Sequence, residues 1–312
     1  MEFSTFGTTE LRISKIGFGC WAIGGHGYGQ VDDHESIKAI QKALYWGINF
    51  FDTADIYGFG HSEAILSKGL GPRRHDVFIA TKFGLCWNDA GKIYKDCSAK
   101  RAMEALEGSL RRLRIDCIPL YQIHWHDGIT PLEETMEILL RFRDEGKIRF
   151  IGIANPILQL IDPANTIEKP CSIQTLFNLI DRQNEQLLHD LYYSARMNTL
   201  VYGPLARGLL SGKYGEKATF SINDTRMNDE NFKGGKLCRN LEIVRELKVL
   251  SKKYNKSIAQ TALRWVLDIP FISSVIVGIK TDTQVMDNIG ASGWNLSDEH
   301  WCYLSSLSSL EI

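Results

Sequence analysis

The chain has 312 residues, of which 44% are hydrophobic and 23% are charged, and its 36 basic and 37 acidic side chains leave a formal net charge of −1. This composition excludes a disordered chain or a coiled coil, and the near-neutral charge argues against nucleic acid or an acidic membrane surface as a partner. With no long apolar run, no secretion signal and seven cysteines that form no C-x-x-C pair, we expect a reduced, cytoplasmic protein that spans no membrane.

Eight short runs of apolar, β-branched and aromatic residues recur along the chain and predict strands. Most are continuously apolar rather than alternating, which is typical of parallel strands buried on both faces. In chain order the predicted strands are Ile16–Gly19, Asn49–Asp52, Val77–Lys82, Ile118–His124, Phe150–Ala154, Ser172–Thr175, Thr199–Tyr202 and Ser274–Val277.

Segments with a helical spacing of apolar residues separate these runs. Eight strands that alternate with helices predict an α/β fold, a (β/α)8 barrel that forms a single domain over residues 1–312. The predicted helices are Asp33–Trp46, one that begins after an N-cap at Ser98, one between Pro131 and Gly146, Leu237–Tyr254 and Ser257–Leu267.

Two segments fall outside this alternation. At the start, Glu2–Phe6 and Leu11–Ile13 predict a β-hairpin, which we expect to close the bottom of the barrel. After the seventh predicted strand comes a long polar stretch, Gly208–Lys236, which contains several glycines. Long loops inside compact domains are usually functional, so we expect a functional role for this loop.

Ionisable side chains end three consecutive predicted strands. Asp52 ends the second strand, Lys82 the third and His124 the fourth. Tyr57 follows Asp52 by five residues. In a (β/α)8 barrel the carboxyl ends of the strands form the catalytic face. Each residue alone has a structural explanation, such as a helix cap or a solvated charge, but different acid–base groups on neighbouring strands predict a site.

The chemistry of this group is proton transfer to a carbonyl. A tyrosine normally titrates near pH ~10, and an ammonium beside the phenol favours the phenolate. Lys82 is placed to supply that charge and Asp52 to hold Lys82 by an ion pair. His124 is placed to donate a hydrogen bond to a carbonyl oxygen or to help move the proton. None of these side chains supplies hydride, so a nicotinamide cofactor is required.

A series of motifs extends this pattern: Gly17–Trp21, Gly47–Ala54 with Tyr57-Gly58 and Ser62-Glu63, Ala80–Lys82, Leu120–His124, Gly146–Arg149, Ile151–Ile153 and Tyr202–Gly208. In this order and spacing they resemble the aldo-keto reductases over essentially the whole chain, and most of all the bacterial members of inositol-operon and general-stress type. The resemblance implies NADP(H) bound at the barrel mouth without a Rossmann domain. It also implies a catalytic tetrad of Asp52, Tyr57, Lys82 and His124.

The resemblance further implies contacts with the nicotinamide and the pyrophosphate of the cofactor. Asn155 and Gln174 would bond the nicotinamide carboxamide, and Tyr202 would stack on the nicotinamide ring. The residues at the positions where the family wraps the pyrophosphate are Pro204, Leu205, Arg207, Gly212 and Lys213.

At the adenosine end, the resemblance implies a motif that begins at Gly278. Lys280 and Thr281 would meet the 2′-phosphate, and Gln284 and Asn288 would meet the adenine. The family often has an arginine for the 2′-phosphate, whereas a lysine is a point charge without a bidentate fork. The sequence therefore favours NADP(H) over NAD(H) through a single ammonium.

Three tryptophans mark the expected substrate pocket. Trp21, Trp87 and Trp125 each follow the end of a predicted strand, so we expect them to line the mouth of the barrel. Such walls favour apolar or flat carbonyl compounds, and the expected partner is a small-molecule carbonyl substrate.

Two polar clusters receive a structural interpretation. Although His124 and His126 lie only two residues apart after a predicted strand, we expect no metal site there. The basic run Arg111–Arg114 is interpreted as the solvated end of a helix rather than as a phosphate site.

Three functions stay open. The favoured one is an NADPH-dependent reductase of aldehydes or ketones. The same residues also serve the reverse reaction, in which an NAD(P)-dependent dehydrogenase oxidises a sugar or cyclitol hydroxyl, and cofactor preference distinguishes the two directions. The third is a cofactor-binding regulatory subunit, as in the potassium-channel β subunits of the family.

Overall fold

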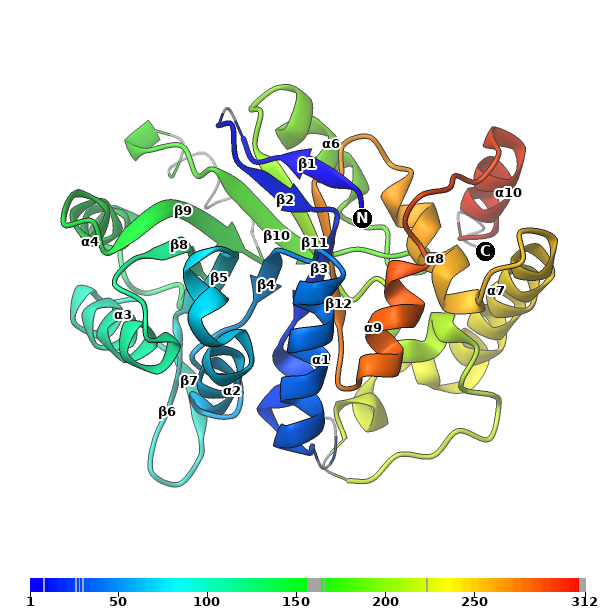
Figure 1. Cartoon of the computed structure of the whole chain (residues 1–312), viewed down its shortest axis with the longest axis horizontal. Coiled ribbons are helices and arrows are strands. Elements are labelled where there is room, and N and C mark those ends of the chain that lie inside the picture. The colour runs from blue at the N-terminus through cyan, green and yellow to red at the C-terminus, as the bar shows by residue number, and fades with distance from the viewer. Residues whose placement is uncertain are drawn as a thin grey trace.

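A closed barrel of parallel strands forms the centre of the protein (Figure 1). The computed structural model describes residues 1–7, 9–25, 27, 29, 31–155, 164, 166–222 and 224–308. All eight predicted strands are present, and their ends lie within two residues of the predicted ones. The strands, in their order around the barrel, are β3 (Ile16–Gly19), β4 (Phe50–Asp52), β5 (Phe78–Phe83), β8 (Ile118–Ile123), β9 (Ile148–Ala154), β10 (Ser172–Leu176), β11 (Asn198–Tyr202) and β12 (Ser274–Gly278).

Pairing between the last strand and the first closes the barrel. β12 is parallel to β3, with Val275 opposite Ile16 and Gly278 opposite Gly19. The β4 and β5 strands are buried at every residue, because one face packs inside the barrel and the other against the helices. This burial explains why the strands are continuously apolar in sequence.

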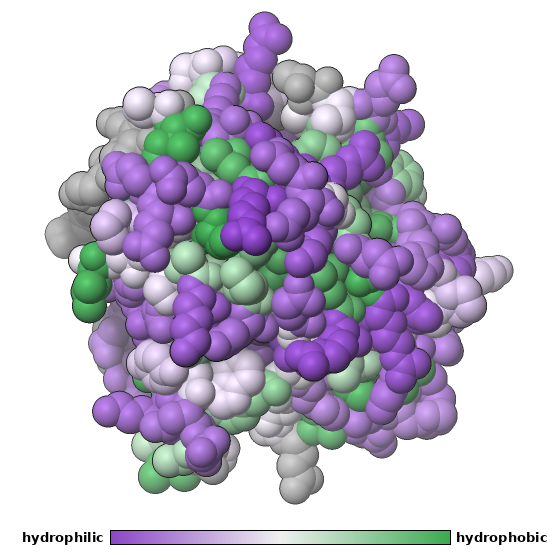
Figure 2. Space-filling model, turned by 90° about the vertical axis from the view of Figure 1, so that its left-hand side faces the viewer, coloured by the Kyte–Doolittle hydropathy of each residue, from purple (hydrophilic) through white to green (hydrophobic). Residues whose placement is uncertain are grey.

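Helices surround the barrel and include every predicted helix. Ser98 caps the helix after it by accepting from the backbone of Arg101, and Ser257 forms a capping box with Gln260. The α-helices are α1 (Asp33–Tyr45), α2 (His61–Leu70), α3 (Ala99–Leu113), α4 (Leu132–Asp144), α6 (Glu185–Tyr193), α7 (Gly234–Lys253), α8 (Ile258–Leu267), α9 (Asp282–Ile289) and α10 (Asp298–Ser308). Figure 2 shows that the side carrying α3 and α4 is largely hydrophilic, with small scattered apolar patches.

Helix α2 was not predicted, because polar side chains occupy its buried face. Ser62 and Glu63 are fully buried at its first turn, so the apolar spacing that marks an amphipathic helix is interrupted. Both side chains have partners on other elements: Ser62 donates to the carbonyl of Cys20, and Glu63 accepts from Thr81.

The predicted amino-terminal hairpin closes the bottom of the barrel. It consists of β1 (Phe3–Thr5) and β2 (Arg12–Ser14), which pair antiparallel. Phe6 follows β1 and is fully buried, with its ring 4.6 Å from that of Phe78 and 5.3 Å from that of Phe150. These rings fill the amino-terminal end of the barrel, so the opposite end is the open one.

A second hairpin and the long loop project from the open end. The hairpin consists of β6 (Leu85–Trp87) and β7 (Ile93–Lys95) and lies within the segment between β5 and α3. Figure 1 shows this hairpin and the segment between residues 212 and 233 at the lower edge, opposite β1 and β2. Among the described residues, none of the helices is long and apolar enough to cross a membrane.

Candidate active site

The barrel brings the four strand-end residues together at its open end. Asp52 is the last residue of β4, Lys82 lies near the end of β5, and His124 directly follows β8. Because β4, β5 and β8 are neighbours in the barrel, their carboxyl ends form one continuous rim. Tyr57 lies in the turn between β4 and α2, which folds back over this rim.

The ammonium of Lys82 is held between a carboxylate and a phenol. Lys82 is fully buried, and its Nζ donates to Asp52 Oδ1 at 2.7 Å and to the carbonyl of Thr53 at 2.9 Å. The same nitrogen lies 3.5 Å from the hydroxyl of Tyr57 and 5.1 Å from the centre of its ring. A buried charge pair is stable only when further polar groups bond to it. Here the Asp52 carboxylate and the Thr53 carbonyl both accept from the Lys82 ammonium.

His124 is neutral in this site. Its ring stands edge-on to Tyr57 at a centroid distance of 5.6 Å, and the residue is 6% exposed. Burial, and then the charge of Lys82, hold the pKa of His124 well below its usual range. A neutral imidazole carries one N–H, so the residue is suited to donate a hydrogen bond rather than to carry charge.

Three residues expected at the nicotinamide connect to this group by hydrogen bonds. Gln174 donates from Nε2 to Asp52 Oδ2 at 2.7 Å. Asn155 donates from Nδ2 to the backbone carbonyl of His124 at 3.0 Å and accepts from the Tyr202 hydroxyl at 2.7 Å. Gln174 therefore orients the acid that holds the lysine, a connection that its position in the sequence did not indicate.

The three predicted tryptophans surround the rim in different ways. The ring of Trp21 stacks on that of Tyr57, with centroids 6.0 Å apart and planes at 21°. Trp87 lies on the β6 strand of the projecting hairpin. Trp125 is 39% exposed, and the ammonium of Lys95 lies 5.2 Å from the centre of its ring. Only Trp21 therefore contacts the tetrad among the ring pairs described here.

The predicted pyrophosphate segment forms the turn after β11. Pro204 and Leu205 lead into a 3-10 segment, Ala206–Ser211, in which Arg207 has a φ of +54°. Gly212 caps this segment with a φ of +74°, and a Cβ there would meet Ile258 at 2.5 Å. Glycine is therefore required at this turn, and Lys213 follows it directly.

The long loop is tied to the loop after β3. Thr225 donates to the carbonyl of Gly27 from its backbone nitrogen at 3.0 Å and from its hydroxyl at 3.2 Å. Arg207 holds the loop from the other side, with 3.2 Å to the carbonyl of Thr225 and 3.2 Å to Asp229 Oδ2. The loop thus lies at the open end of the barrel, and its functional role stays a prediction.

The predicted adenosine motif forms the start of α9. Gly278 ends β12, and Thr281 caps α9 by accepting from the backbone nitrogen of Gln284 at 3.4 Å. The Gln284 side chain accepts from the backbone nitrogen of Lys280 at 2.7 Å. Asn288 lies one turn further and is 4% exposed. Lys280, Thr281 and Gln284 are thus brought together at the N-terminus of α9, whereas Asn288 lies near the other end of this helix.

Two further cations gather around Lys280. Burial lowers the pKa of Lys280, and the charges of Arg226 and Lys213 lower it further, while Asp224 opposes them. Arg226 donates from Nε to Asp224 at 2.8 Å. Sequence analysis did not select Arg226, because no pattern in a long irregular loop shows that it returns to the start of α9. The only hint in the sequence was the close spacing of Asp224 and Arg226, which is typical of an ion pair.

A second set of buried charges lies behind Tyr57, and it corrects one prediction. Arg112 was predicted to be part of a solvated helix end, but its Nε lies 2.7 Å from Oε2 of the fully buried Glu63. The prediction was wrong for Arg112 because α3 turns this residue toward α2. A neighbouring pair joins Arg101 of α3 to the fully buried Asp55 at 2.6 Å.

Asp55 predicts a measurable pH dependence of stability. Burial, and then the charge of Glu63, raise the pKa of Asp55 to about 7 from an ordinary 3.8. Between these two values the folded state holds the proton more tightly than the unfolded state, so rising pH lowers the free energy of unfolding over this window. We expect the stability of the wild type relative to Asp55→Asn to fall as the pH rises from about 4 to 7, measured by urea denaturation. A difference that stays constant over this range would contradict the shift.

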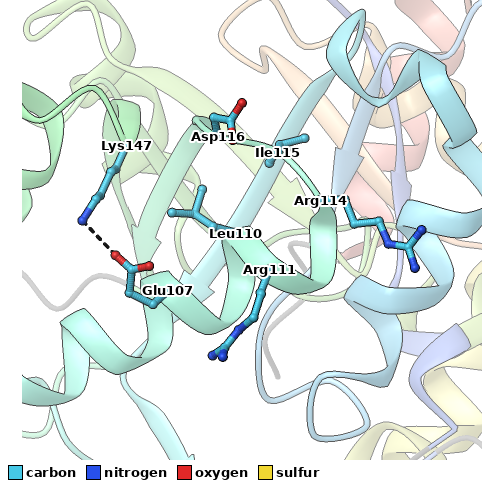
Figure 3. Close-up of a pocket in the computed structure, with 7 residues that line it drawn as sticks. All are labelled: Glu107, Leu110, Arg111, Arg114, Ile115, Asp116 and Lys147. Atoms are coloured by element: carbon cyan, nitrogen blue, oxygen red, sulfur yellow. Dashed lines mark hydrogen bonds and ion pairs between the residues drawn. The ribbon is translucent and has the colours of Figure 1, made fainter.

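A hollow of about 500 Å³ lies at the other end of the barrel (Figure 3). Asp116 lies two residues before β8 and Lys147 directly precedes β9, so the hollow faces the amino ends of these strands and lies away from the tetrad. In the described part of the chain, no cluster of three or more His, Cys, Asp or Glu side chains could hold a metal ion. The residues that line the hollow are Glu107, Leu110, Arg111, Arg114, Ile115, Asp116 and Lys147.

Comparison with known proteins gives one family model and several relatives that match most of this chain. The model of the aldo/keto reductase family matches residues 15–309. Aldo-keto reductase YhdN of Bacillus subtilis is 37% identical, with 96% of this chain and 91% of that protein covered. An NADH-specific methylglyoxal reductase of Escherichia coli is 33% identical, with 96% and 95% covered. The structure of the glycerol dehydrogenase AKR11B4 of Gluconobacter oxydans matches with a TM-score of 0.91 and 34% identity, with 98% and 94% covered.

Proposed function

Because this chain belongs to the aldo/keto reductase family, we propose that it reduces an aldehyde or ketone to an alcohol with NADPH, using Tyr57 as the general acid. The observation that supports this proposal most directly is the position of the Lys82 ammonium, 2.7 Å from Asp52 and 3.5 Å from the Tyr57 hydroxyl. The membership itself makes the protein an oxidoreductase that uses a nicotinamide cofactor.

The proposed proton path runs through the tetrad. Tyr57 donates its phenolic proton to the carbonyl oxygen of the substrate as negative charge develops there. The Lys82 ammonium stabilises the phenolate that remains, and Asp52 holds this ammonium in place. The neutral His124 donates a hydrogen bond to the same carbonyl oxygen and so orients the substrate toward Tyr57. When bound, the nicotinamide supplies the hydride that reaches the carbonyl carbon.

The residues at the open end fit such a cofactor. The Tyr202 hydroxyl donates to Asn155 Oδ1 at 2.7 Å, which holds the Tyr202 ring beside the amide expected at the nicotinamide. Asn155 and Gln174 supply amide groups for the carboxamide. The long loop, held by Arg207 and Thr225, crosses the end of the barrel where the pyrophosphate would lie.

Preference for NADPH is proposed from the cations at the start of α9. Burial lowers the pKa of Lys280 most, and repulsion by the charges of Arg226 and Lys213 lowers it further, while Asp224 opposes them. A 2′-phosphate between them would relieve this repulsion and would also meet the free N–H groups of the helix terminus. Arg226 supplies the guanidinium that the sequence motif at 278–288 lacks. The Escherichia coli relative is NADH-specific, so cofactor choice in this protein depends on these residues.

We expect Lys280→Ala to weaken NADPH and to leave NADH nearly unchanged. A charge-assisted hydrogen bond is worth about 1.5–3 kcal/mol, which corresponds to roughly 10- to 150-fold in affinity. Dissociation constants for both cofactors, measured from quenching of tryptophan fluorescence, test the expectation. Lys236→Ala removes an exposed lysine at the start of α7 and is the matched control. Equal weakening of the two cofactors would remove the case for a 2′-phosphate site at Lys280.

The reverse reaction is the second candidate function. The solved structure with a TM-score of 0.91 is a glycerol dehydrogenase, and the tetrad serves oxidation of an alcohol by the same proton path in reverse. A panel of aldehydes and ketones assayed with NADPH and with NADH, beside a panel of polyols assayed with NADP⁺ and NAD⁺, distinguishes the two. We expect the highest kcat/KM for a carbonyl compound with NADPH. A polyol with NAD⁺ at the top of the ranking would make the protein a dehydrogenase.

A further inference from the structure

Arg101 connects three elements next to the proposed active site. From α3, its Nη2 reaches Asp55 Oδ2 at 2.6 Å, and its Nε donates to the sulfur of Cys86 at 3.0 Å. Its guanidinium lies 5.6 Å from the centre of the Trp87 ring. Cys86 and Trp87 both belong to β6, the inner strand of the projecting hairpin. One guanidinium thus joins the helix layer to the hairpin.

Asp55 ties the same guanidinium to the loop that carries the proposed acid. It lies two residues before Tyr57, is fully buried, and its backbone nitrogen donates to the carbonyl of Lys82 at 3.4 Å. The far end of this loop returns to the hairpin, because the ring of Phe59 lies 5.5 Å from that of Trp87. The Trp87 ring therefore lies next to the Arg101 guanidinium, which Asp55 anchors, and next to the ring of Phe59.

The fork of the guanidinium explains why an arginine occupies this position. Two of its nitrogens are engaged at the same time, one by the carboxylate of Asp55 and one by the sulfur of Cys86, while its central carbon lies over the Trp87 ring. A lysine ammonium is a point charge without a planar face. Lysine at this position therefore retains the charge but cannot make all three contacts.

We propose that Arg101, anchored by Asp55, is a positioning residue that fixes Trp87 in the wall of the substrate pocket and so determines preference for flat, aromatic carbonyl compounds. The proposal rests on the proposed function, because it takes the rim beside Tyr57 as the place where the carbonyl binds. Among the contacts described here, Arg101 touches none of the four tetrad side chains and is linked to them only through Asp55, whose backbone nitrogen bonds to Lys82; it acts on the substrate through Trp87.

The test compares two aldehydes and two arginines of the same helix. Arg101→Met and Arg112→Met are each assayed with NADPH on a three-carbon aldehyde and on an aromatic aldehyde, above the pKa of about 7 that Asp55 has. Arg112 also pairs with a buried acid, Glu63, but makes no contact with Trp87 among those described. An aromatic contact is worth about 0.5–1.5 kcal/mol, so we expect Arg101→Met to raise KM for the aromatic aldehyde roughly 2- to 13-fold.

The expected pattern has three more parts. The kcat for the three-carbon aldehyde and the dissociation constant for NADPH change less than about twofold in Arg101→Met. Arg101→Lys recovers only part of the KM. Trp87→Phe and Arg101→Met are non-additive in KM for the aromatic aldehyde, because both disturb the same contact. Arg112→Met lowers the melting temperature but leaves the ratio of the two KM values unchanged.

A measurement that needs no turnover accompanies the kinetics. The emission of Trp87, obtained by subtracting the spectrum of each Trp87→Phe variant, should shift to longer wavelength and become easier to quench with acrylamide when Arg101 is replaced. If the wild type reduces neither aldehyde, the proposed function fails while this spectrum still reports on Arg101. Equal effects of Arg101→Met and Arg112→Met on both aldehydes, or an unchanged Trp87 spectrum in both Arg101 variants, would overturn the proposal.

Discussion

Tyr57→Phe is expected to remove most of the reductase activity while the cofactor still binds. The substitution deletes the only hydroxyl that lies within 3.5 Å of the Lys82 ammonium in the contacts described above, and it leaves the ring that stacks on Trp21. General acid catalysis typically contributes about 10² to 10⁴-fold, so we expect kcat to fall by that factor. Steady-state kinetics with a saturating carbonyl substrate, together with a fluorescence titration of NADPH, measure the two effects separately.

A second tyrosine provides the control. Tyr45 ends α1 and is 80% exposed, so Tyr45→Phe makes the same chemical change away from the open end and should leave both kcat and NADPH binding unchanged. A Tyr57→Phe enzyme that keeps more than half of its turnover would show that another group protonates the carbonyl.

Lys82→Met is expected to lower activity through the same proton donor. Without the ammonium, the phenolate formed at Tyr57 loses its nearest positive charge, so the remaining rate should show a pH profile displaced to higher pH. Groups that act as one unit are strongly non-additive. We therefore expect Lys82→Met/Tyr57→Phe to be scarcely slower than the slower single variant.

The double variant decides what Lys82 does. Fully multiplicative losses would mean that Lys82 has a separate role, such as holding the rim of the barrel through Asp52 and Thr53. Because removal of one partner of a buried pair leaves an uncompensated charge, each variant is first compared with the wild type by thermal unfolding. Asp52→Asn/Lys82→Met removes both charges and controls for that cost.

The barrel was predictable from the sequence because its strands carry a strong local signal. Runs such as Val77–Ala80 are apolar throughout, which is typical of a strand covered on both faces. Helix α3 was equally predictable, because Ser98 is a typical N-cap residue at its start. In contrast, α2 buries Ser62 and Glu63 at its first turn, and these polar residues interrupt the apolar spacing by which a helix is recognised.

The tetrad was predictable for a topological reason. Asp52, Lys82 and His124 end consecutive barrel strands, so their meeting follows once the strands and their parallel order are known. No such rule predicts the contacts of Arg101 and Arg226. Each depends on where an irregular segment, the hairpin of β6 or the loop at 224–229, lies in space. Long-range side-chain pairing of this kind produces no periodic pattern of residue types in the sequence.

The pairing of β12 with β3 has a consequence for how the protein is made. Val275 lies opposite Ile16, so 275 − 16 = 259 positions separate the two partners that close the barrel. At a synthesis rate of about 5–20 residues per second, β3 is synthesised roughly 13 to 50 seconds before β12. During that time one edge of β3 lacks its final partner, and unpaired edges invite aggregation. The strands β1 and β2 pair with each other. The beginning of the nascent chain can therefore form a local hairpin before β12 has been synthesised.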